Sequence, residues 1–116
     1  MKEYLLLLRG GRTMSSKTEA ENKAESQSWF AYMGDLQKKG QLVGGLPLVG
    51  GGKTVFPKSI SADAVTSARE GIVGGYLIVT AESLDQATDL AKACPHLANE
   101  GNIEVREIAP MPNMQK

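Results

Sequence analysis

The chain has one histidine, His96, two residues after its one cysteine, Cys94. An imidazole exchanges protons near neutral pH and a thiolate is a nucleophile, so both side chains could do chemistry. Cys94 falls on the apolar side of a predicted helix, at the end where the helix dipole disfavours a thiolate, so we expect a buried structural cysteine. His96 has two open interpretations: proton transfer, or a non-catalytic place in which it caps free carbonyls or lies at the surface. One histidine and one cysteine are too few for a strong transition-metal site, and we expect neither metal nor cofactor.

Charged side chains near the C-terminus form the second candidate. Glu104 and Arg106 alternate with Ile103 and Val105, a pattern typical of a strand with one covered face. The charged pair then shares the uncovered side, either as a solvated salt bridge of about 0 to 1 kcal/mol or as the lining of a cleft between two subunits. Arg9, at the exit of the first predicted strand, is a further candidate for binding an anionic group.

Gly52-Lys53-Thr54 resembles the end of a phosphate-binding loop. That motif requires a glycine five positions before Gly52, where this chain has Pro47, and a helix after it, where the residues VFPKSI favour extended chain. We therefore expect no nucleotide binding at this glycine-rich stretch.

The first half of the chain predicts a strand followed by a long helix. Tyr4 to Leu8 is a continuous apolar run, typical of a strand covered on both faces. Ser16 and Glu19 have the spacing of a capping box, and Gly40 suits the residue after the helix end. The apolar side of this helix is predicted from three residues at helical spacing with one beside them: Trp29, Met33 and Leu36, with Phe30.

The middle of the chain is harder to assign. Leu42 to Leu48 is apolar but contains Gly44, Gly45 and Pro47, which favours a short or bulged strand. Thr54 to Ile60 is expected to pair with it as an irregular hairpin. Ser61 to Gly71 has no clear periodicity, and it has two open interpretations, a helical turn or an extended active-site loop.

The stretch from Gly74 to Pro110 predicts strand, helix and strand. Tyr76 to Val79 is a short apolar run after two glycines, which favours a buried strand. Ser83 is the expected N-cap of the helix, with Gln86 reaching back to it. Its apolar face is expected to contain Leu84, Ala87, Ala91 and Cys94, and Pro95 should end it.

These elements follow the order βαββαβ, which predicts an α+β, ferredoxin-like fold, an antiparallel sheet with two helices on one face. The other face is left without cover, so we expect a homodimer through it. The length of 116 residues suits one domain over 1–116, with 1–2 and 111–116 as flexible ends.

Thirteen basic and thirteen acidic residues give a formal net charge of zero. The chain therefore has no electrostatic footprint for nucleic acid or an anionic membrane, and we expect neither as a partner. A single cysteine permits no internal disulfide, and the apolar run Leu5 to Leu8 is too short for a signal peptide or a membrane span. We expect a cytoplasmic protein.

The segments GGYLIVTAESLDQATDLAKACPHL and GNIEVREIAPM, together with the opening MKEYLLLLRG, resemble the YCII-related family of small bacterial proteins, also called DGPF-domain proteins. The resemblance covers nearly the whole chain. It implies a ferredoxin-like fold that pairs into a dimeric α+β barrel.

Counting back from Gly74, the Asp-Gly-Pro-Phe motif of that family falls on residues 63–66, where only Asp63 matches. The resemblance implies that Asp63 acts as a general base or holds a ligand hydroxyl, and the alternative is a turn aspartate bonded to its own backbone. His96 is the histidine available to form a catalytic pair with it.

Two functions follow as expectations. The first is an enzyme of the lyase or dehydrochlorinase kind that acts on a small molecule, with Asp63 and His96 catalytic and Arg9, Glu104 and Arg106 binding the ligand. The second is a non-catalytic, ligand-binding or regulatory homodimer. A purely structural protein is a third class, which the neutral charge and the missing cofactor motifs do not separate from the first two.

Overall fold

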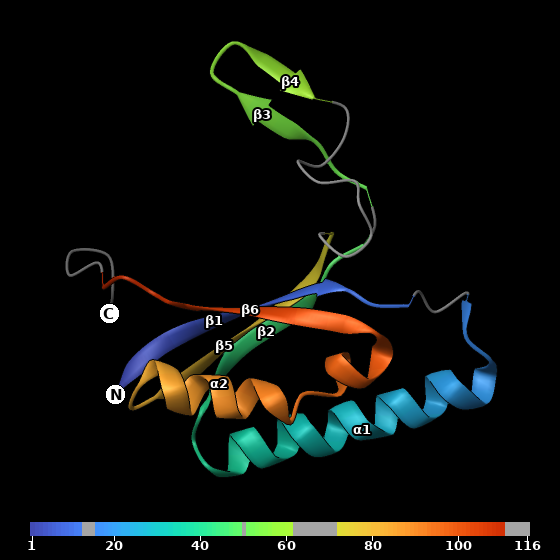
Figure 1. Ribbon diagram of the computed structural model, residues 1–116, viewed down its shortest axis with the longest axis vertical. Coiled ribbons are helices and arrows are strands. Elements are labelled where there is room, and N and C mark those ends of the chain that lie inside the picture. Colours follow the sequence, from blue (N-terminus) through green and yellow to red (C-terminus); the bar gives the residue numbers. More distant parts are fainter. Residues whose placement is uncertain (13–15, 50, 62–71, 111–116) are drawn as a thin grey trace.

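The computed structural model of the chain describes residues 1–12, 16–49, 51–61 and 72–110. A four-stranded antiparallel sheet has the order β2-β5-β1-β6, and two helices cover one of its faces (Figure 1). The strands are β1 (Lys2–Gly10), β2 (Leu42–Pro47), β5 (Val73–Ala81) and β6 (Gly101–Glu107), and the helices are α1 (Glu19–Lys38), α2 (Leu84–Lys92) and the short 3-10 helix η3 (Pro95–Asn99). The predicted ferredoxin-like α+β fold is confirmed.

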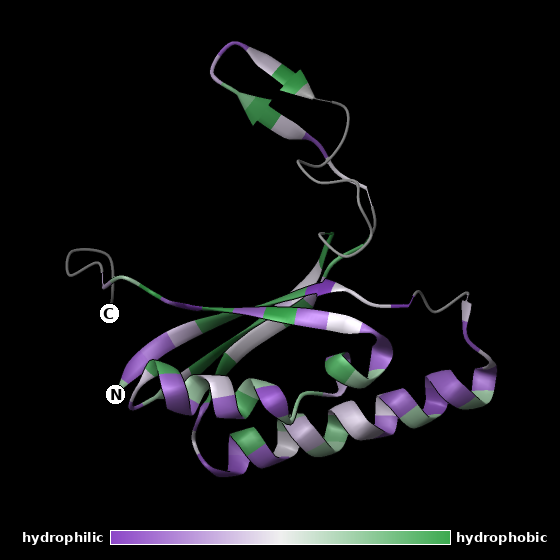
Figure 2. Ribbon diagram, viewed as in Figure 1, coloured by the Kyte–Doolittle hydropathy of each residue, from purple (hydrophilic) through white to green (hydrophobic). Residues whose placement is uncertain are grey.

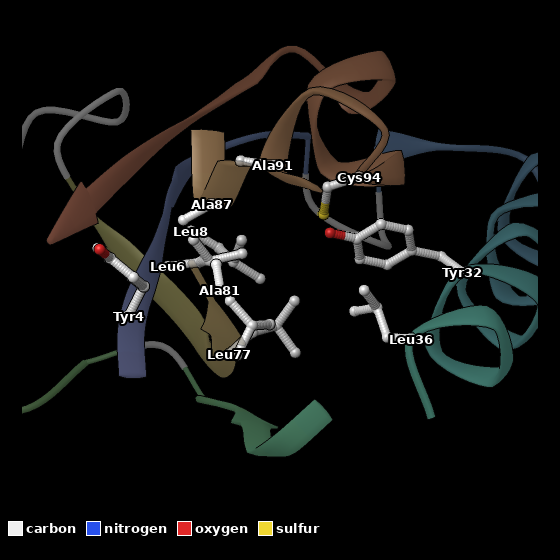
Figure 3. Close-up of a cluster of buried hydrophobic side chains, with 11 residues drawn as sticks. Tyr4, Leu6, Leu8, Tyr32, Leu36, Leu77, Ala81, Ala87, Ala91 and Cys94 are labelled. Atoms are coloured by element: carbon white, nitrogen blue, oxygen red, sulfur yellow. The ribbon is translucent and has the colours of Figure 1, made fainter. Parts of the chain in front are cut away.

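The core lies between the sheet and the helices. In β1, Tyr4, Leu6 and Leu8 are buried on the helix side, whereas Leu5 and Leu7 are half-buried on the open side. This alternation follows from the two-residue period of a strand, and it makes β1 apolar on both faces. Figure 3 shows the core side chains between the strands and the helices.

The N-terminus of α1 is capped two residues later than predicted. Thr18 Oγ1 accepts a hydrogen bond from the Glu21 backbone amide at 3.1 Å, and Glu21 Oε1 accepts one from the Thr18 amide at 2.8 Å. The pairs Ser16/Glu19 and Thr18/Glu21 both fit the capping-box pattern, so spacing alone could not separate them. The Ser16 carbonyl instead accepts a bond from Arg12 Nη2 at 3.0 Å, which places Ser16 in the turn before the helix.

The apolar side of α1 is only partly as predicted. Leu36 is buried and Trp29 and Met33 pack against the core, but Phe30 is 81% exposed. Tyr32, which lies near this side of the helix, is buried in its place, and its hydroxyl donates a hydrogen bond to the Leu90 carbonyl at 2.7 Å.

The segment Thr54 to Ile60 does not pair with β2, contrary to the prediction. It forms a separate hairpin of β3 (Thr54–Phe56) and β4 (Ser59–Ser61), while β2 pairs with β5. Gly51 and Gly52 have φ angles of 88° and 131°, left-handed backbone that favours glycine and interrupts extended chain between the two segments. Strand β3 follows Lys53 directly, so this stretch lacks the helix that a phosphate-binding loop requires.

Helix α2 begins at the predicted cap, where Ser83 Oγ accepts the Gln86 amide at 3.2 Å. Gln86 Oε1 accepts from the Glu82 amide, one residue before the expected partner. Ala87, Ala91 and Cys94 are buried as predicted, but Leu84 is 51% exposed because it occupies the first helical position, at the outer end of the buried face.

Two of the predicted features, Asp63 and the flexible end 111–116, lie outside the described residues. In the described part of the chain, no helix is long and apolar enough to cross a membrane.

Candidate functional site

A cavity of about 650 Å³ lies between α1 and the ends of β1, β2 and β5, a size typical of small-molecule sites. Its wall is mostly apolar, with Trp29 and Met33 from α1 and Leu46, Leu48 and Ile72 from the sheet side. A few polar side chains line it as well: Arg12, Glu25, His96 and Asn99. An apolar cavity with a few polar groups can bind a small ring compound and orient it.

His96 is buried in η3 and lines this cavity. Its Nε2 atom lies 2.7 Å from the carbonyl oxygen of Arg9. Because a carbonyl can only accept, Nε2 must carry the proton and donate it, which leaves Nδ1 as the basic nitrogen of the neutral ring. Among the described residues Nδ1 has no hydrogen-bond partner. The alternative of a surface histidine is wrong because the ring is buried, and the carbonyl that it bonds belongs to β1 rather than to the end of the preceding helix. The neutral ring keeps Nδ1 as a nitrogen that can accept a proton.

Two glycines make room for the His96 ring. A Cβ atom on Gly101 would lie 2.6 Å from Cε1 of the ring and closer still to Nε2, and a Cβ on Gly11 would lie 2.9 Å from Cε1. Gly11 also has a φ of 92°, a left-handed conformation that side chains other than glycine rarely adopt. Neither glycine was predicted to have a role. The signal that could have found them is a glycine close to the end of a strand, which can mark close approach of another group.

Asn99 fastens the loop after β1 to η3. Its carbonyl accepts the Arg12 amide at 2.9 Å, and its Nδ2 donates to the Arg12 carbonyl at 3.1 Å. Its Oδ1 accepts a bond from Lys17 Nζ at 3.1 Å, and Lys17 is also paired with Glu25 of α1. The Lys17 side chain is only 7% exposed, so a buried ammonium group with satisfied hydrogen bonds holds Asn99 and Glu25, which both line the cavity. Nothing in the sequence pattern predicted it.

The open face of the sheet contains the second predicted set. Arg9 Nη2 and Nε lie 3.0 and 3.2 Å from Glu104 Oε1, and Arg106 Nη1 lies 3.1 Å from Glu104 Oε2. The hydrogen bond from Arg106, and after it the one from Arg9, lowers the pKa of the Glu104 carboxyl below its usual value. The structure thus brings Arg9, Glu104 and Arg106 together.

The charged cluster and His96 lie on opposite faces. Glu104 is opposite Leu7 in the register of β6 and β1, so both face the open side, whereas Leu8 faces the helices and lines the cavity with His96. Because Asp63 is not described, His96 is the one member of the predicted catalytic pair that the structure places.

Cys94 is a structural residue, as predicted. It is buried, and burial raises the pKa of its thiol to about 11, which opposes thiolate formation. Figure 3 shows the Tyr32 hydroxyl directed toward its sulfur, and burial raises the pKa of Tyr32 as well. Within the described ranges, no group of three or more His, Cys, Asp or Glu side chains gathers as metal ligands.

Comparisons with known proteins agree with this fold. Among curated proteins, none matches the chain. A solved structure of 5-chloro-2-hydroxyhydroquinone dehydrochlorinase from Burkholderia phenoliruptrix AC1100, in complex with 2,5-dihydroxybenzoquinone, is similar with a TM-score of 0.57 and 20% sequence identity, over 96% of this chain and 97% of that one. The model of the YCII-related domain matches residues 4–112. With nearly its whole length matched, the chain belongs to the YCII-related domain family.

Proposed function

We propose that the chain binds a small hydroxylated ring compound in the 650 Å³ cavity and transfers a proton with His96. The observation that carries this proposal is the bond from Nε2 to the Arg9 carbonyl, which leaves Nδ1 as the base of a ring that lines the cavity. The similar dehydrochlorinase, whose structure contains 2,5-dihydroxybenzoquinone, supports the choice of ligand class.

One base in an apolar cavity can serve several proton-transfer reactions, and the similar dehydrochlorinase supports elimination among them. A base removes a proton, the electron pair left behind forms a new double bond, and chloride leaves with the electrons of its bond to carbon. The atoms and electrons balance without an oxidant or reductant. A dehydrochlorinase-like reaction is therefore the activity we propose, with Asp63 as a second proton-transfer group.

We also propose that the protein is a homodimer through the open face of the sheet. Leu5, Leu7, Tyr76 and Ile78 lie side by side on that face in the register of β1 and β5, each only half-buried in the single chain. An apolar sheet face requires cover, and a second copy supplies it. The cluster of Arg9, Glu104 and Arg106 then lies beside the interface.

The alternative is a ligand-binding dimer without catalysis. The charged cluster favours it, since it gathers the Arg9 and Arg106 guanidinium groups at one place on the open face, and guanidinium groups bind carboxylate and phosphate ligands well. Binding without turnover in the following experiment would favour this alternative.

Two substitutions of His96 test the catalytic role. His96→Gln keeps a donor at the position of Nε2 and removes the base, whereas His96→Asn has a polar atom at the position of Nδ1 and loses the donor to Arg9. The one tryptophan, Trp29, lines the cavity, so quenching of its fluorescence by 2,5-dihydroxybenzoquinone measures binding. Chloride release from a chlorinated hydroxyhydroquinone measures turnover.

We expect His96→Gln to keep binding and to lower chloride release by about 10²- to 10⁴-fold, the usual contribution of a general base. We expect His96→Asn to lose turnover and also stability. Equal chloride release by His96→Gln and the parent protein would contradict the proposal.

A further inference from the structure

We call the β3–β4 hairpin, residues 51–61, the arm. Val55 and Ile60 are directly opposite each other in its register and are 73% and 64% exposed, and Phe56 is 51% exposed. Figure 2 shows apolar residues on both strands of the arm. A two-stranded hairpin alone in water is marginally stable at best, so an arm with three exposed apolar side chains requires a surface to pack on.

The arm extends from the end of β2 to the side of the sheet opposite the helices (Figure 1). Between β2 and the arm, Leu48 and Val49 are exposed, and Leu46 at the end of β2 is exposed beside Tyr76 of the open face. The exposed apolar side chains therefore continue from the open face of the sheet along the chain into the arm.

We propose that the arm of each chain packs against a second copy of the chain seated on the open face. This inference rests on the homodimer of the proposed function. A copy on that face lies on the same side of the sheet as the arm, because the helices occupy the other side. In a two-fold symmetric dimer, each copy contributes one arm and one open face, so the arm and the open face of each copy are both covered by the other copy.

The amount of apolar surface agrees with this arrangement. The six exposed apolar side chains from Leu46 to Ile60, of which Leu46 and Leu48 also line the cavity, have on the order of 600 Å² of accessible area, the upper end of what a monomeric protein exposes in one patch. Two such surfaces, added to the open faces, reach the roughly 1,200 to 2,000 Å² that a stable interface buries.

The two phenylalanines of the chain give a matched test. Phe56 is in the arm, and Phe30 is exposed on α1, on the opposite side of the sheet. Each is replaced in turn by the photo-cross-linker p-benzoylphenylalanine in the full chain. Light scattering measures the oligomeric state, and mass spectrometry of the irradiated protein locates the cross-linked peptides.

We expect a dimer in which position 56 cross-links to the other subunit and position 30 does not. A dimer whose position 56 links only within its own chain, or no more between chains than position 30, overturns the arm and leaves the dimer standing. A monomer at tens of micromolar overturns both, while binding in the cavity is judged separately by Trp29 fluorescence.

A second variant measures the energetic role of the arm. Val55→Ser with Ile60→Ser removes apolar surface far from the core, so the fold should be retained. We expect the dimer dissociation constant to rise at least tenfold, and an unchanged constant overturns the proposal.

Discussion

Gly101→Ala tests whether the His96 ring is held as the structure shows. The new methyl group would lie 2.6 Å from Cε1 and closer to Nε2, well inside van der Waals contact. The ring cannot turn away freely, because Nε2 is bonded to the Arg9 carbonyl and Gly11 lies at its other side. The substitution should therefore displace the imidazole from its place.

The cost follows from three contributions. Overpacking a well-filled site destabilises by about 1 to 3 kcal/mol, and loss of the Nε2 bond adds about 1 kcal/mol. The φ angle of Gly101 is not in the left-handed region, so alanine itself should stabilise by about 0.4 to 1 kcal/mol through the unfolded chain. We expect Gly101→Ala to lower the free energy of unfolding by about 1 to 3 kcal/mol.

A double-mutant cycle with His96→Ala isolates the contact. Once the ring is absent, Gly101→Ala should be neutral or slightly stabilising, so the two substitutions should show a coupling of about 2 kcal/mol. Urea unfolding of the four proteins measures it. Gly44→Ala is the control, since no atom lies within 4 Å of its Cβ position, and it should be nearly neutral.

The same cycle can refute the placement of His96. If Gly101→Ala costs as much without His96 as with it, the ring does not lie against Gly101. The assignment of Nδ1 as the base would then be wrong as well, because it depends on this position of the ring.

Two further predictions concern stability at alkaline pH and the hydrogen bonds of Asn99. Burial raises the pKa of the Cys94 thiol from 9.0 to about 11, so the folded state keeps a proton that the unfolded chain releases. The contribution of this thiol to the free energy of unfolding is fully present below pH 9, and about 2 to 3 kcal/mol of it is lost as the pH rises to 11. Between pH 8 and pH 10.5, the free energy of unfolding should therefore fall less for Cys94→Ala than for the parent protein. Asn99→Asp keeps the acceptor for Lys17 but removes the donor to the Arg12 carbonyl. We expect it to lower the free energy of unfolding by about 1 to 3 kcal/mol and to weaken the quenching of Trp29 fluorescence by the ligand. Equal melting temperatures and equal quenching would contradict the role given to Asn99.

The fold was predictable from sequence where local signals agree with one another. From Ser83 onward, the cap at Ser83 and the proline after Cys94 mark the two ends of α2 to within two residues, whereas the two glycines expected before the strand lie inside β5, which begins at Val73. In the N-terminal half, Ser16 and Thr18 offered equivalent caps, and only packing of the turn before α1 decides between them. Local spacing identifies such patterns but does not rank them.

The candidate site was predictable only in part, because its contacts join distant segments. Alternation placed Glu104 and Arg106 on one face of a strand, and Arg9 joins them since β1 and β6 are neighbours in the ferredoxin-like order. The place of His96 depends on a carbonyl 87 residues away and on two glycines that admit its ring. No short-range pattern contains that information.

Arg9 takes part in both candidate sites through different atoms. Its guanidinium is bonded to Glu104 on the open face, and its carbonyl accepts the proton of His96 Nε2 on the helix side. Every residue type has a backbone carbonyl, so the side chain at position 9 can change without removing the bond that fixes the histidine tautomer. The open face and the cavity are thus built on the same strand but depend on separate features of it, and substitutions that alter the proposed interface can leave the proposed proton transfer intact.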